Sequence, residues 1–353
     1  MRALMMGLLV SLLTGCASGQ SRATAAAAPA PVTDDGAWSR YVAKFVRPEG
    51  RVVDTANAGV SHSEGQGYGM LLAESFGDRA QFDKLWAWTQ KNLQVRKDHL
   101  LAWRWRPSNG ADKGAVDDMN NASDGDVLVA WALLRAAARW GDGRYATPAG
   151  LMLADLRAKA VRPTRFGPVL LPGLEGFVHD PIVTLNPAYW VFPAFEYFGQ
   201  HDDPTWNAVA RTGWTLLDQA KFGAHKLPPD WLLVGSDLRV ADQMSPYFGY
   251  DAMRVPLYVL WSHDAPAHEK SAIAGIRAYW SSLSRVDQIP ARVNLLNDGT
   301  DSNPLPVGVQ RIARWTIDGD PGARVSAADL DRMLYYDASL ALLSEFAFAE
   351  TGR

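Results

Sequence analysis

Residues 127–140 read VLVAWALLRAAARW and are apolar around almost the whole circumference of a helix. A helix at the surface of a globular protein alternates apolar and polar positions every three to four residues, so a helix that is apolar on all sides must be buried on all sides. Residues 188–198, AYWVFPAFEYF, have the same character. We therefore expect an all-α protein in which an inner layer of helices is surrounded by an outer one.

Apolar residues recur mostly at helical spacing from residue 34 onward. The predicted helices cover residues 36–46, 64–77, 79–93, 124–140, 147–161, 187–199, 204–222, 249–263, 266–283 and 326–349. Residues 51–54 and 166–173 are predicted as short strands or extended loops. Pairs of helices joined by connections of alternating length indicate either a helical solenoid or a closed toroid of helix hairpins. No repeat of fixed period is visible, which favours the toroid, but periodicity alone does not separate the two folds.

The composition allows a large core and gives no sign of a nucleic-acid partner. The chain has 353 residues, of which 48% are hydrophobic and 21% charged, and its net charge is −3. A nucleic-acid-binding domain carries clustered Lys and Arg, and no such block stands out here. No low-complexity linker interrupts residues 34–353, so we expect them to form a single domain.

The N-terminus has the features of an export signal. Residues 1–16 combine an early arginine with a short apolar run, which predicts a secretory leader and is too short for a transmembrane helix. Residues 12–16, LLTGC, resemble a bacterial lipobox with Cys16 as the lipidated residue. The other interpretation is an ordinary leader that is cut later, near residues 23–31. Cys16 is the only cysteine, so no intramolecular disulfide can form.

Residues 17–33 are rich in Ala, Ser and Pro and are predicted to be a flexible tether without a fold of its own. Together with the leader, this predicts an exported protein of the periplasm or outer membrane. Lipidation of Cys16 would attach it to a membrane.

Glu64 stands where a turn becomes a helix, in SHSEGQGYGM at residues 61–70, and three glycines follow it. Each Gly weakens a helix by roughly 1 kcal/mol relative to Ala, so something must approach this helix closely. The positive end of the helix favours an ionised Glu64. Glu64 can therefore donate a proton only if burial or a second negative charge raises its pKa. The alternative is that Glu64 belongs to a capping motif.

Two other segments supply candidates for that second charge. Asp124 and Asp126 head a predicted helix in NNASDGDVLVAW, residues 120–131, and Asp251 lies in YFGYDAMRVPLYVLW, residues 247–261. Arg254 follows Asp251 by three residues, so on a helix the two share a face and a salt bridge would hold Asp251 ionised, as a general base requires. The structural alternatives are that Asp124 is a plain N-cap and that Asp251 and Arg254 form an ordinary helix pair.

Tryptophan is frequent, with 14 residues beside 11 Tyr and 12 Phe. Most of these rings are expected in the core. Trp103 and Trp105, however, lie two residues apart in LAWRWRP, residues 101–107, which has no helical spacing. Flat rings in loops near carboxylates suit stacking on sugar faces, so each is a candidate for substrate binding as well as for the core.

The sequence predicts no metal site and no cofactor. Residues 117–126, DDMNNASDGD, are rich in oxygen ligands but lack the pattern of a calcium loop. No pair of histidines has the spacing of a helical zinc site. Neither a Gly-x-Ser-x-Gly elbow nor a glycine-rich phosphate loop occurs.

Four motifs occur in an order that resembles glycoside hydrolase family 8, the bacterial endoglucanases and their relatives that act on xylan and chitosan. They are SEGQGYGMLLA from residue 63, ASDGDVLVAWALLRAAARW from residue 122, NPAYW from residue 186 and YDAMRVPLY from residue 250. The second stretch departs from the family signature only in Val129, where Ile or Met is usual. The resemblance covers residues 60–340 and implies an (α/α)6 toroid with a few short strands in loops, and a substrate cleft across the end where the inner helices begin.

The resemblance also implies roles for the carboxylates in an inverting hydrolysis of β-1,4 links. Glu64 matches the proton donor and Asp251 the general base that activates water. Asp124 matches the residue often labelled as nucleophile, which in an inverting mechanism more plausibly holds and distorts the sugar beside the cleaved bond. We expect Asp124 to raise the pKa of Glu64 by like-charge repulsion.

Other matching residues are implied to contact substrate or its binding groups. Arg254 matches the partner of the base, and Tyr189 and either Tyr335 or Tyr336 match aromatic residues that line the site. Tyr68 is expected to line the cleft or simply to pack. The glycines after Glu64 are expected to leave room for a sugar ring and for neighbouring helices.

The resemblance therefore implies a cellulase, an endo-β-1,4-glucanase, most like the type that accompanies bacterial cellulose synthesis. This would make a β-1,4-linked polysaccharide its substrate and the cellulose synthase machinery a candidate partner. The nearest alternatives are a xylanase or chitosanase of the same family. An alternative of another class is a non-catalytic glycan-binding lipoprotein, which the retained carboxylates argue against.

Overall fold

The computed structural model describes residues 32–108 and 113–352. The predicted leader, Cys16 and most of the predicted tether lie outside the described residues. Among the helices of the described part, none is both long enough and apolar enough to cross a membrane.

Helices dominate the described residues. The α-helices are α1 (Ala37–Phe45), α2 (Ser63–Ser75), α3 (Arg79–Asn92), α4 (Ser123–Trp140), α5 (Ala146–Lys159), α6 (Phe192–His201), α7 (Thr205–Gln219), α8 (Val255–Trp261), α9 (Ala265–Ala272), α10 (Ala274–Ser281), α11 (Val307–Asp318), α12 (Ala327–Arg332) and α13 (Tyr335–Thr351). Three 3-10 helices complete the set: η1 (Pro187–Tyr189), η2 (Ala252–Arg254) and η3 (Val286–Gln288).

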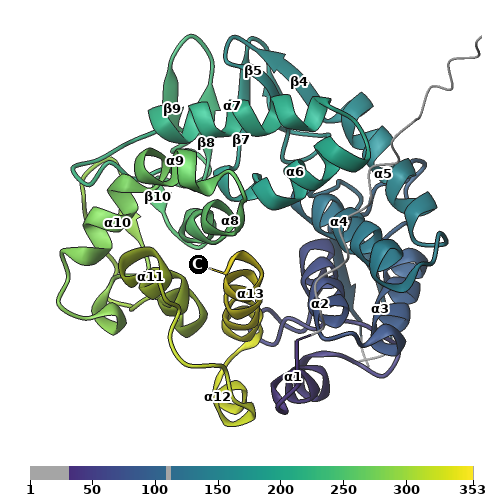
Figure 1. Cartoon of the computed structure of the whole chain (residues 1–353). Coiled ribbons are helices and arrows are strands. Elements are labelled where there is room, and N and C mark those ends of the chain that lie inside the picture. The colour runs from purple at the N-terminus through teal and green to yellow at the C-terminus, as the bar shows by residue number, and fades with distance from the viewer. Residues whose placement is uncertain (1–31, 109–112, 353) are drawn as a thin grey trace, which may run out of the picture.

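The inner helices close into a ring (Figure 1). Helix α2 packs against α4, α4 against α6, α6 against α8, α8 against α13 and α13 back against α2, while α11 packs against both α8 and α13. Helices α3, α5, α7, α9 and α10 each pack on an inner neighbour from outside. Because the ring closes, the toroid prediction is confirmed and the solenoid alternative is wrong. Residues 123–133 of α4 are all buried, as predicted for an inner helix.

An early helix and a late helix of the described chain meet on the outside of the ring. Helices α1 and α12 lie side by side there (Figure 1). The ammonium group of Lys44 in α1 donates to the carbonyl oxygens of Leu330, Asp331 and Met333, at 2.7–2.9 Å. These carbonyls lie at the C-terminal end of α12, where a helix leaves acceptors without partners. The long helix predicted over 326–349 is therefore wrong: it is two helices, and Lys44 satisfies the carbonyls at the break.

Other predicted boundaries also shift. Helix α11 was not predicted, because its β-branched residues lower helix propensity and its stability depends on packing against neighbours that include α13, α8 and α10. The predicted helix 266–283 is divided between α9 and α10. The predicted helices 187–199 and 249–263 start with η1 and η2 instead, and these short turns bring Tyr189 and Arg254 to one end of the ring.

Short antiparallel strands lie in the loops that connect the helices of the ring. They are β1 (Ser61–His62), β2 (Arg104–Pro107), β3 (Gly114–Asp118), β4 (Val161–Thr164), β5 (Gly167–Leu170), β6 (Val178–His179), β7 (Ile182–Leu185), β8 (Leu232–Val234), β9 (Leu238–Val240), β10 (Tyr247–Phe248) and β11 (Val293–Asn294). They pair as β1-β2-β3, β4-β5, β6-β7-β8-β9 and β10-β11. Strand β5 lies in the predicted segment 166–173, whereas residues 51–54 contribute only an isolated bridge from Val52 to Val46.

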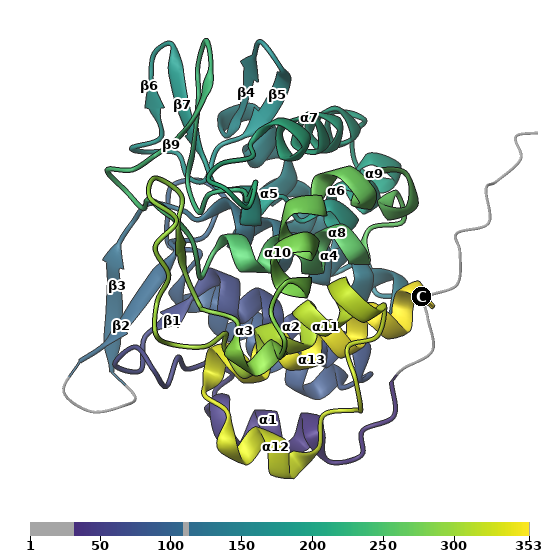
Figure 2. The ribbon, with the colours of Figure 1, turned by 90° about the vertical axis from the view of Figure 1, so that its left-hand side faces the viewer.

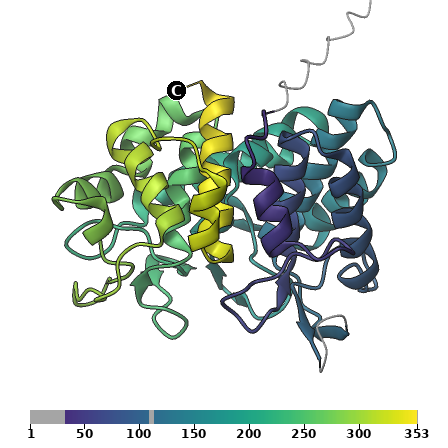
Figure 3. The ribbon, with the colours of Figure 1, turned by 90° about the horizontal axis from the view of Figure 1, so that it is seen from below.

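The strands and the helices occupy different sides of the molecule. Figure 2 shows β1, β2, β3 and β6 on the side from which α13 begins, and in Figure 3 the C-terminus of α13 lies at the opposite side from the strands. Strands β1, β2, β3 and β6 therefore lie at the end of the ring at which the inner helices start, whereas the β4–β5 hairpin packs against the outer helix α7.

The glycines of α2 permit an unusually close contact between α2 and α4. A Cβ atom on Gly67 would lie 2.6 Å from the Cβ atom of Leu128, and one on Gly125 would lie 2.1 Å from the Oγ atom of Ser63. A Cβ atom on Gly65 would lie 2.5 Å from the Tyr335 hydroxyl oxygen. These contacts are with protein atoms, so Gly65 and Gly67 are explained by the packing of inner helices.

We predict that Gly67→Ala destabilises the protein by about 1–3 kcal/mol, the usual cost of overpacking a well-packed site. The obstructing atom, Leu128 Cβ, is fixed to the α4 backbone and cannot turn away. Urea unfolding at equilibrium measures the change in the free energy of unfolding.

Gly150→Ala in α5 is the matched control for this substitution. A Cβ atom there would meet nothing within 4 Å, so this substitution should be neutral or stabilising by up to about 1 kcal/mol. Equal stability of Gly67→Ala and wild type would contradict the close-packing explanation.

Candidate active site

All three carboxylates singled out from the sequence reach one cavity at the end of the ring where the inner helices begin. The cavity has a volume of about 170 Å³. Its lining residues are His62, Ser63, Glu64, Trp103, Ala122, Asp124, Tyr189, Asp251 and Arg254. They come from the starts of α2 and α4, from η1, from η2 and from the loop before β2.

A single buried arginine links two of the carboxylates. Arg254 is only 4% exposed; its Nη2 atom donates to Asp251 Oδ1 at 2.8 Å and its Nη1 atom forms a salt bridge with Glu64 Oε1. The predicted pair of Arg254 with Asp251 is thus present. The contact of the same guanidinium with Glu64 was not predicted, since it joins segments 190 residues apart.

A buried tyrosine, Tyr68, donates a hydrogen bond to the Glu64 carboxyl group. The Tyr68 hydroxyl donates to Glu64 Oε1 at 2.9 Å and lies 3.0 Å from the Tyr258 hydroxyl. Tyr68 is 1% exposed, so it lies beneath the cavity and does not line it. The described contacts of Glu64 are therefore a cation and a hydroxyl, whereas the sequence led us to expect a like-charged neighbour. The N-cap of α2 is His62 and its side chain makes no capping bond, so the capping interpretation of Glu64 is not supported.

Asp124 is buried in the helix start itself. Its side chain accepts the N–H of Gly125 at 2.8 Å, and it is 3% exposed. The N-cap of α4 is Ala122, so Asp124 is not the plain N-cap of the alternative interpretation. Burial, together with the charges of Asp251 and Asp126, raises the pKa of Asp124 to about 8.

Asp251 also sits in surroundings that favour its protonated form. Burial and the negative charge of Asp230 raise the pKa of Asp251 to about 7, and the nearby amide of Asn186 opposes the rise. Its side chain is still 31% exposed toward the cavity. A carboxylate with a pKa near neutrality is suited to accept a proton from water at neutral pH.

Asp126, the other acid of this motif, does not reach the cavity. It is fully buried and accepts the N–H of Leu101 and the amide of Asn121, both at 2.8 Å. Burial raises the pKa of Asp126 to about 7. Asp126 thereby fixes the segment that leads to Trp103.

The two tryptophans of LAWRWRP, Trp103 and Trp105, lie in different surroundings. Trp103 lines the cavity, where its ring stacks on His62 at 5.9 Å and its indole N–H donates to Asp118 at 2.7 Å. Trp105 is 5% exposed and packs edge-on against Trp88, so its predicted role in substrate binding is wrong. Trp103 precedes β2 whereas Trp105 lies within it, so strand alternation does not put the two rings on one face.

The three tyrosines predicted to line the site, Tyr189, Tyr335 and Tyr336, also lie in different surroundings. Tyr189 lines the cavity and meets the ring of Trp231 edge-on at 6.2 Å. Tyr335 is 3% exposed and packs beside Gly65 in the core. Tyr336 is partly exposed, and its hydroxyl donates to the carbonyl oxygen of Tyr250 at 2.6 Å, immediately before Asp251. Neither of these two lines the cavity itself.

Several groups at the site were not singled out from the sequence. His62 precedes Glu64 by two residues, Asn186 opens the NPAYW motif, and Asp230 and Trp231 come from the segment before β8. His62 and Asn186 could have been found by their places in the quoted motifs. Nothing in the local sequence connects Asp230 or Trp231 to Asp251 or Tyr189.

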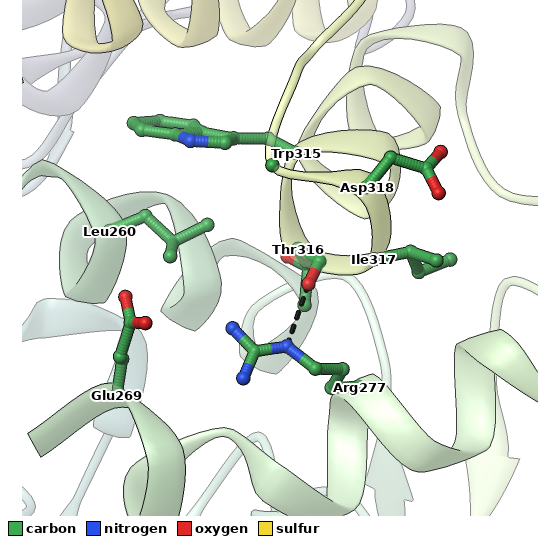
Figure 4. Close-up of a pocket in the computed structure, with 8 residues that line it drawn as sticks. Leu260, Glu269, Arg277, Trp315, Thr316, Ile317 and Asp318 are labelled. Atoms are coloured by element: carbon green, nitrogen blue, oxygen red, sulfur yellow. Dashed lines mark hydrogen bonds between the residues drawn. The ribbon is translucent and has the colours of Figure 1, made fainter. Parts of the chain in front are cut away.

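A second cavity lies at the far ends of α8 and α11 (Figure 4). It has a volume of about 460 Å³, and Arg277 beside it donates to the carbonyl oxygen of Thr316 at 2.7 Å. Glu269 and Asp318 are its acidic residues, and Figure 4 shows them on different sides of Arg277. None of the residues predicted to act on substrate lines this cavity, and it lies away from the helix starts.

Comparison with known proteins shows the family to which the chain belongs. The profile of the family described as "Glycosyl hydrolases family 8" matches residues 1–349. The chain belongs to this family. As a family 8 glycosyl hydrolase it is an enzyme that cleaves glycosidic bonds, and its (α/α)6 fold is that of the family.

Individual relatives are similar to this glycosyl hydrolase over nearly the whole length of its chain. A protein of Novacetimonas hansenii named probable endoglucanase is 38% identical over 346 residues, 95% of this chain and 97% of its own. The crystal structure of endoglucanase Cel10 from Klebsiella pneumoniae is 37% identical with a TM-score of 0.83, covering 90% of this chain and 100% of its own. Endo-β-1,4-glucanase CMCax from Acetobacter xylinum is 37% identical with a TM-score of 0.79, covering 90% and 98%.

We predict that Asp124→Asn stabilises the glycosyl hydrolase more at pH 8 than at pH 5. The pKa of Asp124 is about 8 in the folded protein and near 3.8 when unfolded, so the folded state holds the extra proton between these values and loses stability as the pH rises. The difference between variant and wild type should grow by more than about 1 kcal/mol, because one pKa unit corresponds to about 1.4 kcal/mol.

Thermal or urea unfolding at both pH values measures this difference. Asp237→Asn removes a carboxylate whose side chain is 62% exposed and serves as the control, for which no such dependence on pH is expected. A wild-type-like response of Asp124→Asn would show that Asp124 is not strained by burial.

Proposed function

We propose that the protein is an endo-β-1,4-glucanase that hydrolyses internal links of cellulose or a related β-glucan with inversion at the anomeric carbon. The observation that carries this proposal is the pair of Glu64 and Asp251 held by one buried arginine in a cavity at the helix starts. The relatives named as endoglucanases support the substrate class.

Glu64 is the general acid in this mechanism and Asp251 the general base. Glu64 gives a proton to the glycosidic oxygen as the bond to the anomeric carbon breaks, and Asp251 takes a proton from the water that attacks the same carbon from the opposite face. An inverting enzyme separates its two carboxyl groups enough to admit that water. Arg254 contacts each carboxyl group through a different terminal nitrogen, which keeps the groups apart yet on the same site.

Arg254 is shared between the proposed acid and the proposed base. Arg254 contacts both carboxyl groups, and Glu64 must be protonated to act as the acid. Glu64 acts once it has taken a proton from solvent water, and Arg254 stays paired with Asp251. The neighbouring Tyr68 hydroxyl keeps Glu64 in place during this change.

The remaining cavity residues bind the sugar. Asp124 projects from the start of α4 and, when protonated near neutral pH, both donates and accepts hydrogen bonds, which suits a group that holds the sugar ring in a distorted shape. Trp103 and Tyr189 offer flat apolar faces on the walls, as sugar rings require.

The rival substrates differ from cellulose at single positions. Xylan lacks the group on C5, and chitosan carries an amine on C2. The glycan-binding alternative without catalysis is disfavoured, since the chain belongs to a hydrolase family and keeps both proposed catalytic acids.

The setting of the enzyme is a further part of the proposal. The apolar leader and the lipobox-like segment support export to the periplasm or outer membrane, with attachment through Cys16. A β-glucanase in that compartment could act beside a cellulose synthase complex. Metabolic labelling with a fatty acid, lost in Cys16→Ser, tests the attachment.

We predict that the wild type releases reducing ends from carboxymethylcellulose at least tenfold faster than from xylan or chitosan. Glu64→Gln and Asp251→Asn should each lose this activity by roughly 10²-fold or more, since positioned acid–base groups contribute about 10²–10⁴ to the rate. A reducing-sugar assay on the three polysaccharides measures both effects.

Glu269→Gln, at the cavity of Figure 4, is the matched carboxylate control and should keep wild-type activity. Circular dichroism confirms that each variant is folded. Faster cleavage of xylan or chitosan would overturn the substrate assignment, and near-normal turnover by Glu64→Gln or Asp251→Asn would overturn the roles of these residues.

A further inference from the structure

Asp230 is a buried carboxylate directly behind the turn that carries Asp251. It is 6% exposed and lies between α7 and β8, in a different segment of the chain from Asp251. Its Oδ1 atom accepts the N–H groups of Gly249 and Ala252, both at 2.9 Å. Its Oδ2 atom accepts the hydroxyl of Ser245 at 3.0 Å. All described polar contacts of the carboxylate are thus with the segment 245–252.

The geometry leaves little freedom to this turn. Gly249 and Ala252 flank Asp251 on either side, so the two bonds to Asp230 Oδ1 fix the backbone on both sides of the proposed base. A Cβ atom on Gly249 would lie 2.7 Å from Asp230 Oδ2, so the carboxylate and the turn are in close contact. The turn continues into η2, whose Arg254 N–H donates to the carbonyl oxygen of Asp251 at 3.0 Å.

Acidic, neutral and basic side chains surround Asp251. Asp230 brings negative charge toward it, although burial raises the pKa of Asp230 as well, and burial of Tyr336 raises the pKa of that hydroxyl, which stays neutral. Asp124, whose pKa is about 8, is protonated near neutral pH. Arg254 brings the positive charge. Arg292 lies beside Gly249, but its guanidinium is paired with Asp301 at 2.7 Å. Asp230 therefore opposes the effect of Arg254 on the base.

We propose that Asp230 is a positioning residue for Asp251: it fixes the turn from which the base projects, and its negative charge makes that base a stronger proton acceptor. The proposal rests on the proposed role of Asp251. It follows from the physical effect of a like charge near a carboxylate, which favours the protonated form. Without Asp230, Arg254 alone would hold Asp251 as a weak base.

Asp230→Asn removes the negative charge of Asp230 but can keep its hydrogen bonds to the turn. The Asn Oδ1 atom can still accept the N–H groups of Gly249 and Ala252, and its amide can donate to Ser245, whose hydroxyl both donates and accepts. We expect a folded enzyme whose acid limb in the pH profile of kcat/KM moves down by about 1 pH unit or more, as loss of a nearby like charge predicts. At the wild-type optimum kcat should fall severalfold, because the base is weaker.

Two further variants complete the test. Asp237→Asn removes an exposed carboxylate from the neighbouring β8–β9 hairpin and should leave the acid limb unchanged. Asp230→Ala removes all three acceptor contacts and should lower kcat more than Asp230→Asn while KM changes little. A merely structural Asp230 would reduce the amount of folded enzyme and leave the acid limb where it is.

A titration without substrate gives an independent readout. Carboxyl ¹³C signals of aspartate-labelled protein report the pKa of Asp251, whose signal is identified by its absence in Asp251→Asn. The signal should titrate at lower pH in Asp230→Asn than in wild type. An unchanged titration and an unchanged acid limb would overturn the proposal. A wild type that cleaves no β-glucan would overturn the proposed function instead, and the ¹³C titration would still decide the effect of Asp230.

Discussion

The site depends on one buried cation, Arg254, that contacts two carboxylates at once. A buried charge is tolerated only when it is paired, and Glu64 and Asp251 provide the pairing from the starts of two different elements. Helix starts are electrically favourable places for carboxylates, because the free N–H groups and the helix dipole carry positive potential there. The closed ring assembles these starts at one end, and the cavity with its acids follows from that arrangement.

This arrangement has a cost that the rest of the fold must offset. Asp124 and Asp251 have pKa values raised to about 8 and 7 by burial and by neighbouring carboxylates, so the folded protein loses stability whenever both ionise. The close packing of α2 on α4, made possible by Gly67 and Gly125, supplies part of the compensation just behind the acids. Strain at a functional site that is supported by a well-packed core is common in enzymes.

The sequence allowed the general plan and the main chemical groups to be predicted, and the failures have physical causes. The helical spacing and the apolar stretches indicated a helical fold but left a solenoid open, and the resemblance to the family implied the ring. The spacing of Asp251 and Arg254 indicated their salt bridge. The contact of Arg254 with Glu64 could not be predicted, because it depends on how distant elements pack. The burial of Trp105 could not be predicted, because it depends on how β2 packs against Trp88 of α3. The break between α12 and α13 depends on Lys44, which lies nearly 300 residues away.

The configuration of the first product tests the central claim most directly. Proton NMR during the first minutes of hydrolysis of a soluble β-1,4-glucan distinguishes the two anomers of the new reducing end before they interconvert. If Glu64 and Asp251 act as acid and base around a water molecule, the α-anomer appears first. If the β-anomer appears first, one carboxylate attacks the sugar as a nucleophile, and the acid and base roles of the pair held by Arg254 are wrong.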